Sequence, residues 1–162
     1  PHSGSPHHRP AAQAPGPAKA ASGGAEGRFR LRTQARRTLA AADPADPDAD
    51  PLGLYLDSIE KYLALPEDTL VLPSHGKPFT GIRPRIAQLK AHHDDRLADA
   101  LSACKKPAHA REIVPVLFKR ELDIHQLTFA MGEAIAHLNY LLRRGRLRRQ
   151  LCDDGVLRFY VV

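Results

Sequence analysis

The stretch Thr69-Leu70-Val71-Leu72-Pro73-Ser74-His75-Gly76-Lys77-Pro78-Phe79 places a single histidine directly after a short apolar run. Residues 69–72 are too few for a helix and are stopped by Pro73, so they predict a short strand. Gly76 lets the backbone turn sharply beyond the strand, so His75 is expected in an exposed loop. One imidazole cannot hold a catalytic metal, because a zinc site needs at least three protein ligands. Taken alone, His75 is either one ligand of a larger site or a loop histidine without a function.

A helix is predicted just before this strand. Asp50 suits the N-cap position, and Pro51 suits the first helical position, where a missing N–H costs nothing. Pro66 marks the end of the helix. The apolar residues between these limits recur at helical spacing: Leu52, Tyr55, Leu56, Ile59, Tyr62 and Leu63. A helix, a turn, a short strand and an exposed loop form an α/β arrangement, in which functional side chains lie beyond strand ends.

Three more helices and a hairpin are expected downstream. Apolar spacing predicts helices over residues 85–103, 110–119 and 125–144. Gly145 stands where a left-handed helix cap belongs, and Asp153-Asp154-Gly155 is typical of a turn between strands at 146–152 and 156–161. Three helices followed by a two-stranded ribbon is the order of a winged helix. The sequence as a whole therefore predicts an α+β protein.

Two sets of polar residues lie on these helices. His92 and His93 are adjacent and so point about 100° apart, which prevents them from chelating one metal from a regular helix. A partly buried, hydrogen-bonded His93 is the favoured interpretation. On residues 125–144, one face is apolar and contains Leu127, Ala130, Met131, Ala134, Ile135, Leu138, Leu141 and Leu142. The other face is expected to be solvated and contains Glu133, His137, Tyr140 and Arg144.

The 162-residue chain has a net charge of +6, and contact with polyanions is one explanation of this charge. Arginine outnumbers aspartate near the C-terminus, which is the electrostatic pattern of a nucleic-acid-binding surface. The candidate phosphate-contacting residues are Arg143, Arg144, Arg146, Arg148, Arg149 and Arg158. The alternatives are a solvated basic surface or a domain that serves only to pack or dimerise.

Residues 1–49 are rich in proline, alanine and glycine, so they are expected to form a disordered leader and linker. Cys104 and Cys152 have neither metal-ligand spacing nor a disulfide framework, which indicates a reducing, cytoplasmic location. The sequence has no run of about 18 apolar residues that could span a membrane. Its first residues also lack the apolar region of a secretory signal.

Several segments resemble the C-terminal part of metallo-β-lactamase-fold hydrolases. These are Asp50-Pro51-Leu52-Gly53-Leu54-Tyr55-Leu56, Leu70-Val71-Leu72-Pro73-Ser74-His75-Gly76 and His92-His93-Asp94-Asp95-Arg96-Leu97. Two more, Glu121-Leu122-Asp123-Ile124-His125-Gln126 and Ala136-His137-Leu138-Asn139-Tyr140-Leu141, are similar to the winged-helix extension of one branch of that superfamily. The resemblance covers residues 50–162. It implies a remnant of an αββα metallo-β-lactamase domain over 50–84 and a winged-helix domain over 85–162, after the leader 1–49.

By this resemblance, His75 matches the last metal-ligand histidine of the family. Such enzymes use one or two metal ions, usually zinc, to activate a water against small-molecule esters or thioesters, amides or phosphodiesters. The family's His-x-His-x-Asp-His motif is absent from this sequence. We therefore expect the chain alone to be inactive and to bind zinc only weakly, as a fragment or an altered reading frame would. The remnant over 50–84 is expected to expose apolar surface, which favours self-association.

Overall fold

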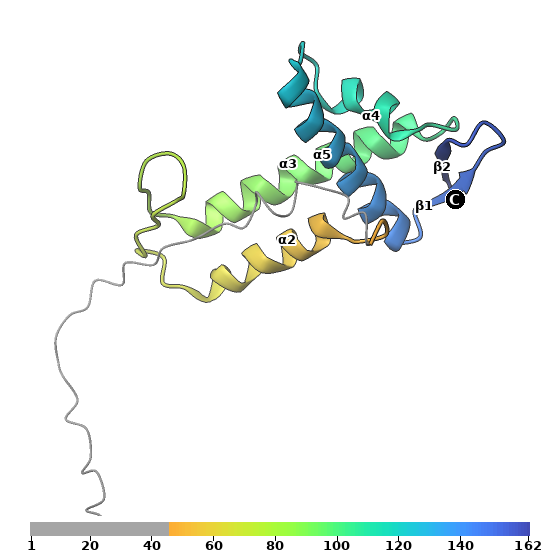
Figure 1. The fold of residues 1–162 in the computed structure, drawn as a ribbon. Helices are drawn as coiled ribbons and strands as arrows, with labels where there is room; N and C mark the ends of the chain where they lie inside the picture. Colours follow the sequence, from red (N-terminus) through yellow and green to blue (C-terminus); the bar gives the residue numbers. More distant parts are fainter. Residues whose placement is uncertain (1–45) are drawn as a thin grey trace, which may run out of the picture.

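The structure is a computed structural model that describes residues 46–162. Within this range the chain forms four α-helices, one 3-10 helix and one pair of antiparallel strands (Figure 1). In chain order these are α2 (Pro51–Glu60), η1 (Lys61–Ala64), α3 (Ile82–Ala103), α4 (Ala110–Leu117), α5 (Ile124–Arg143), β1 (Leu147–Leu151) and β2 (Leu157–Val161). The predicted α+β class is confirmed. Apart from residues 46–49, the predicted leader lies outside the described residues.

The first described helix begins where the sequence predicts. The Asp50 carboxylate accepts a hydrogen bond of 2.8 Å from the Gly53 N–H, and Pro51 occupies the first helical position. α2 then tightens into η1, and Leu65 has an extended backbone with ψ of 150°. That conformation suits a residue that precedes proline, so Pro66 ends the helix as expected.

The predicted strand over residues 69–72 is reduced to a single bridge. Val71 and Phe79 exchange two backbone hydrogen bonds of 2.8 and 3.1 Å, and the chain between them forms a closed loop that turns at Gly76, where φ is 94°. A strand needs a continuous ladder of partners. Within the described range, residues 69–72 pair only with the far end of the same loop. The pairing consists of a single residue from each side, Val71 and Phe79.

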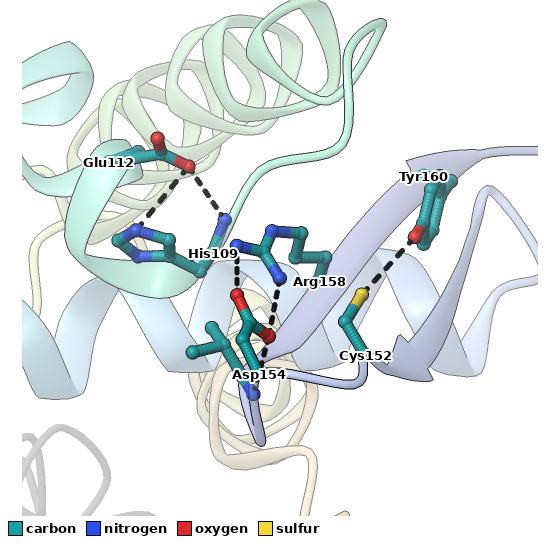
Figure 2. Close-up of polar contacts among 7 residues, drawn as sticks. His109, Glu112, Cys152, Asp154, Arg158 and Tyr160 are labelled. Carbon is teal, nitrogen blue, oxygen red and sulfur yellow. Dashed lines mark hydrogen bonds and ion pairs between the residues drawn. The ribbon is translucent and has the colours of Figure 1, made fainter.

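The downstream helices agree with their predicted positions to within three residues. α3 begins at Ile82 rather than at residue 85, because a proline is tolerated in a first helical turn and Pro84 lies there. α4 ends at Leu117, two residues earlier than predicted, and contains Pro115 in its last turn. Its N-terminus is closed by the Glu112 carboxylate, which accepts a hydrogen bond of 3.0 Å from the His109 N–H (Figure 2).

The predicted hairpin is present. Gly145 follows α5 with a φ of 67°, and Gly155 turns the hairpin with a φ of 73°. β1 and β2 pair from Leu147↔Val161 to Leu151↔Leu157. The connection between α3 and α4 also reaches this ribbon: Ala108 and Phe159 exchange backbone hydrogen bonds of 3.1 and 2.8 Å. The hairpin is therefore attached to the helices through its β2 edge.

One hydrophobic cluster joins α2 to the helices that follow. Leu52 of α2, Ile86 of α3, Ile113 of α4, Leu138 of α5 and Phe159 of β2 are all buried members of it. The expected exposure of apolar surface over 50–84 is therefore wrong for the inner face of α2, because α3 and α5 cover that face. Exposed apolar side chains remain in this region at Leu54, Leu63 and Leu70.

The two faces of α5 differ from the sequence-based prediction. At its N-terminal end Leu127, placed in the apolar stripe, is 41% exposed, next to exposed Ile124 and Phe129. On the face predicted to be solvated, His137 is fully inaccessible, Glu133 and Tyr140 are half-buried, and Arg144 is exposed. The reason is that α5 packs against α2 and α3 as well as α4 (Figure 1), so both of its sides are covered along its C-terminal half.

No helix in the described part of the chain is both long enough and apolar enough to cross a bilayer.

We expect Gly53→Ala to destabilise the protein, although alanine is the better helix former. A Cβ at residue 53 would stand 2.7 Å from Cγ of Asp50 and would displace the carboxylate that caps α2. Losing such a cap costs about 1 kcal/mol, and displacing the carboxylate also breaks its ion pair with Arg144, whereas replacing an unhindered helical glycine by alanine gains up to about 1 kcal/mol. Urea unfolding measures the difference.

The same substitution in an Asp50→Ala background is the matched control. There the cap is already lost, so Gly53→Ala should become neutral or stabilising. A stabilising effect of Gly53→Ala in the unaltered chain would contradict the capping role of Asp50.

Candidate functional site

The His75 loop is held at its base and open at its tip. The bridge between Val71 and Phe79 fixes the two ends of the loop, and Val71 is buried with 1% of its surface accessible. The residues from Ser74 to Pro78, His75 included, are exposed. The prediction of an exposed loop histidine is thus correct in its position, although a bridge rather than a strand supports it.

A cavity of about 430 Å³ lies beside this loop, between α2 and α3. Its floor is aliphatic and aromatic and includes Ile59, Tyr62, Val71 and Phe79. Basic or titratable side chains also line it, namely His75, Lys77 and Arg85. The imidazole therefore stands at the edge of an apolar hollow, where a group bound to it would be partly shielded from water.

The described residues do not supply His75 with co-ligands. In residues 46–162, no three side chains of histidine, cysteine, aspartate or glutamate come together as a metal-binding group. Since zinc needs at least three protein ligands, this part of the chain does not fit a zinc ion by itself.

The six arginines proposed for nucleic-acid contact do not form one free surface. Arg158 makes a two-pronged ion pair with the carboxylate of Asp154, with N···O distances of 2.9 and 2.7 Å (Figure 2). This hydrogen-bonded pair lowers the pKa of Asp154 to about 2 and raises the pKa of Arg158. The pair lies within the hairpin, so Arg158 is engaged in closing the turn at Asp153–Gly155.

Three more arginines contact the segment that precedes α2. Arg149 of β1 forms an ion pair with Asp48, and Arg144 forms one of 2.7 Å with Asp50. Arg143 donates to the Asp48 carbonyl oxygen at 3.4 Å. Of the six, Arg143, Arg146 and Arg148 have no carboxylate partner within the described residues, and the Arg148 guanidinium lies 5.7 Å from the centre of the Tyr160 ring.

A buried histidine pair links α3 to α5, and sequence reasoning recognised only half of it. His93, predicted to be buried and hydrogen-bonded, contacts His137 with 3.3 Å between His93 Nδ1 and His137 Nε2. His137 Nδ1 lies 2.7 Å from the Glu133 carbonyl oxygen and donates to it, so His137 Nε2 is the acceptor and His93 Nδ1 the donor. His137 is neutral in this arrangement, because its Nε2 accepts.

Burial is the main cause of the histidine pKa shifts. It lowers the pKa of His137 to about 4, with a further lowering from the positive charge of a protonated His93. Burial also lowers the pKa of His93, which the Tyr55 ring contacts edge-on at a centroid distance of 5.7 Å. Nearby, Arg96 stands 3.6 Å from Glu133, and burial raises the pKa of that carboxyl. The cluster is therefore structural and holds α2, α3 and α5 together.

Asn139 is the second buried polar residue that the sequence did not single out. It is 3% exposed, and its side-chain amide donates to the carbonyl oxygens of Pro47 and Ala49, both at 3.0 Å. Residues 46–49 are thereby fixed against α5, in contrast to the disordered linker that was predicted. A signal was available, because Asn139 interrupts an apolar helix between Leu138 and Leu141.

Comparison with known proteins gives a consistent result. Residues 97–162 match the family model described as "Metallo-beta-lactamase-like, C-terminal domain". A beta-lactamase domain protein from Burkholderia ambifaria is 57% identical with a TM-score of 0.71, and the match covers 74% of this chain and 36% of that chain. A metallo-beta-lactamase family protein from Thermus thermophilus is 30% identical with a TM-score of 0.58, over 70% of this chain and 34% of that chain. The chain thus spans about a third of the length of these proteins. Comparison with curated proteins found no match.

We expect the free energy of unfolding to fall as the pH drops from about 6.5 to about 4. In this window unfolded His137 binds a proton and buried His137, with a pKa of about 4, does not, so protons favour the unfolded chain. The stabilisation is complete above pH 6.5 and is lost towards pH 4, with a total of about 3 kcal/mol. The raised pKa of Glu133 offsets a part of this loss at the acid end.

Urea unfolding between pH 4 and pH 8 measures this dependence. His137→Gln should flatten it, and His125→Gln, at an exposed position on α5, should leave it unchanged. If His137→Gln does not fold, His93→Gln is the alternative and should reduce the slope. An equal slope in the His93 and His125 variants would contradict the assignment.

Proposed function

Because the described part of this chain is a C-terminal part of a metallo-β-lactamase-fold protein, we propose that it is the C-terminal portion of a zinc-dependent hydrolase with His75 as a metal ligand. The observation that supports this most directly is the loop itself. A histidine is held at an exposed turn, at the edge of an apolar cavity, by a bridge at the base of the loop. An ester or thioester of a small molecule is the substrate class that the family resemblance suggests.

This chain is proposed to be inactive by itself. The sequence lacks the His-x-His-x-Asp-His motif, and residues 46–162 bring no co-ligands to His75. The remaining ligands would have to come from outside residues 46–162. A cytoplasmic location is also part of the proposal, in keeping with free thiols at Cys104 and Cys152.

We further propose that residues 85–162 form a winged helix. The bridge between Ala108 and Phe159 supports this proposal. It pairs the segment before α4 with the edge of the β1–β2 ribbon, which is where the third strand of a winged helix lies. The order of helix, bridge, two helices and hairpin is then that of a winged helix. The first role of this domain would be packing, because its helices α3 and α5 cover the inner face of α2.

Nucleic-acid contact is the second candidate function. Arg146 and Arg148 favour it, because both are exposed and lie at the start of β1. Such contact would be made with phosphates and would be independent of base sequence.

Zinc titration of the purified chain tests the first proposal. We expect no tight site, and His75→Ala should leave the weak binding unchanged, because a lone imidazole is a poor zinc ligand. Isothermal calorimetry measures both. Tight binding at one equivalent that is lost in His75→Ala would contradict the proposed incompleteness of the site.

A chimera tests whether His75 is a metal ligand in a protein that supplies the other ligands of the site. Residues 50–162 would replace the corresponding C-terminal part of the Burkholderia ambifaria protein. The chimera should bind zinc, and His75→Ala should reduce its zinc content, whereas His109→Ala should not. An unchanged zinc content in the His75 variant would remove His75 from the metal site.

Binding to a duplex DNA of random sequence tests the second candidate. We expect affinity to fall steeply as salt rises, with each neutralised phosphate adding about 0.9 to the logarithmic slope. Fluorescence anisotropy at several salt concentrations gives this slope. Arg146→Gln should lower it, and Arg83→Gln, on the exposed start of α3, should not. A salt-independent affinity would exclude this function.

A further inference from the structure

The segment 46–50, which we call the acidic strap, lies against the C-terminal end of α5 and the first strand. Its backbone is recognised directly: the buried Asn139 amide donates to the carbonyl oxygens on both sides of Asp48. The Arg143 guanidinium adds a hydrogen bond of 3.4 Å to the carbonyl oxygen of Asp48 itself. A turn of the chain is thus fixed at three successive carbonyls.

The carboxylates of the strap take two of the arginines predicted to contact phosphate. Asp48 pairs with Arg149 and Asp50 pairs with Arg144, whose guanidinium also lies over the Tyr140 ring at 3.3 Å from its centre. Asp48 Oδ1 is buried, and the Arg149 guanidinium contacts this oxygen directly. Charge and backbone contacts therefore act on the same four residues, 47–50.

We propose that the acidic strap is an intramolecular competitor that occupies the arginine surface of α5 and β1 and keeps it closed to polyanions. The strap contacts Arg143, Arg144 and Arg149, of which Arg149 is half-buried and the other two keep exposed surface, and it leaves Arg146 and Arg148 at its edge. The inference rests on the second candidate function, because it concerns the surface through which this chain would meet a nucleic acid. The inference adds that residues 46–50 of the same chain lower the affinity of this surface for nucleic acid.

The energetics suit a competitor that can be displaced. Partly exposed ion pairs contribute up to about 1 kcal/mol each, so they do not hold the strap irreversibly. The strap is covalently attached, and its local concentration therefore stays high. A duplex offers many phosphates, and it can replace both carboxylates when salt is low. The surface is then closed to weak or short polyanions and opens to long ones.

Asp48 is the position at which the proposal can be tested without loss of the fold. Unlike Asp50, it caps no helix, and Asp48→Asn removes its charge while keeping its size. Asp57→Asn makes the same change of net charge at an exposed position of α2 and serves as the matched control. Arg149→Gln removes the partner of Asp48, so the double variant reports whether the two residues act through each other.

The measurement is the affinity of the full chain for a duplex DNA of about 20 base pairs, by fluorescence anisotropy over a range of salt. We expect Asp48→Asn to tighten binding by about two- to fivefold, since it frees one paired arginine, and to steepen the logarithmic salt slope by about one. Asp57→Asn should have a smaller effect. In the Arg149→Gln background, Asp48→Asn should bring no gain.

Several results would overturn the proposal. Equal gains from Asp48→Asn and Asp57→Asn would show a net-charge effect, and an undiminished gain in the Arg149→Gln background would show that the pair is irrelevant. Salt-dependent binding by the unaltered chain with no gain in Asp48→Asn leaves the nucleic-acid function intact and rejects the strap. Binding by Asp48→Asn alone supports the strap, with the surface closed in the unaltered chain. No binding by either rejects both.

Discussion

The fold depends on how α5 satisfies the polar side chains that it buries. A buried polar group without a hydrogen-bond partner costs about 1–3 kcal/mol, so a helix covered on two sides needs a partner for each such group. His137 meets this requirement within its own helix and through His93 of α3. Asn139 meets it through two carbonyl oxygens of residues 46–49. These two residues decide which segments lie against α5 and in what register.

The position of the His75 loop follows from these contacts. Asn139 and Arg144 hold the chain at residues 47–50, and α2 starts from the Asp50 cap. α2 is then packed on α3 through Leu52, Leu56 and Ile59. The loop leaves the end of η1 and returns to the start of α3, so both of its ends are set by helices that α5 supports. The loop needs only the Val71–Phe79 bridge to complete its closure.

Local chemistry in the sequence was enough to predict the helices, their caps and the hairpin. Asp50, Pro51, Pro66 and Gly145 act on the backbone within a few residues of themselves, and each is found in its predicted role. The failures concern partners that are distant in the chain. The strand over 69–72 has no ladder to join within the described residues, and periodicity alone does not reveal this. The polar face of α5 was assigned to solvent because its partners, His93 and the segment 46–49, are 44 and about 90 residues away.

The candidate sites show the same division between local and distant signals. The turn that exposes His75 is a property of Pro73, Ser74 and Gly76, and it could be predicted from these neighbours. The net charge of the arginine surface could not be predicted from the sequence, because a count of arginines does not include the carboxylates that the fold places beside them. Arg158 finds Asp154 within the hairpin, and Arg144 and Arg149 find carboxylates about 100 residues earlier.

Those earlier carboxylates belong to a proline-broken segment that composition alone would set aside as a linker. Residues 46–49 form a turn in which the Ala49 N–H donates to the Asp46 carbonyl oxygen at 3.1 Å, and Asp48 and Asp50 each reach an arginine from it. This turn uses the Asp46 carbonyl and leaves the carbonyl oxygens of Pro47 and Ala49 to accept from Asn139. The turn that precedes α2 is therefore also what brings both carboxylates to the arginine surface. A basic surface and a nearby acidic linker have to be considered together before either is given a partner outside the chain.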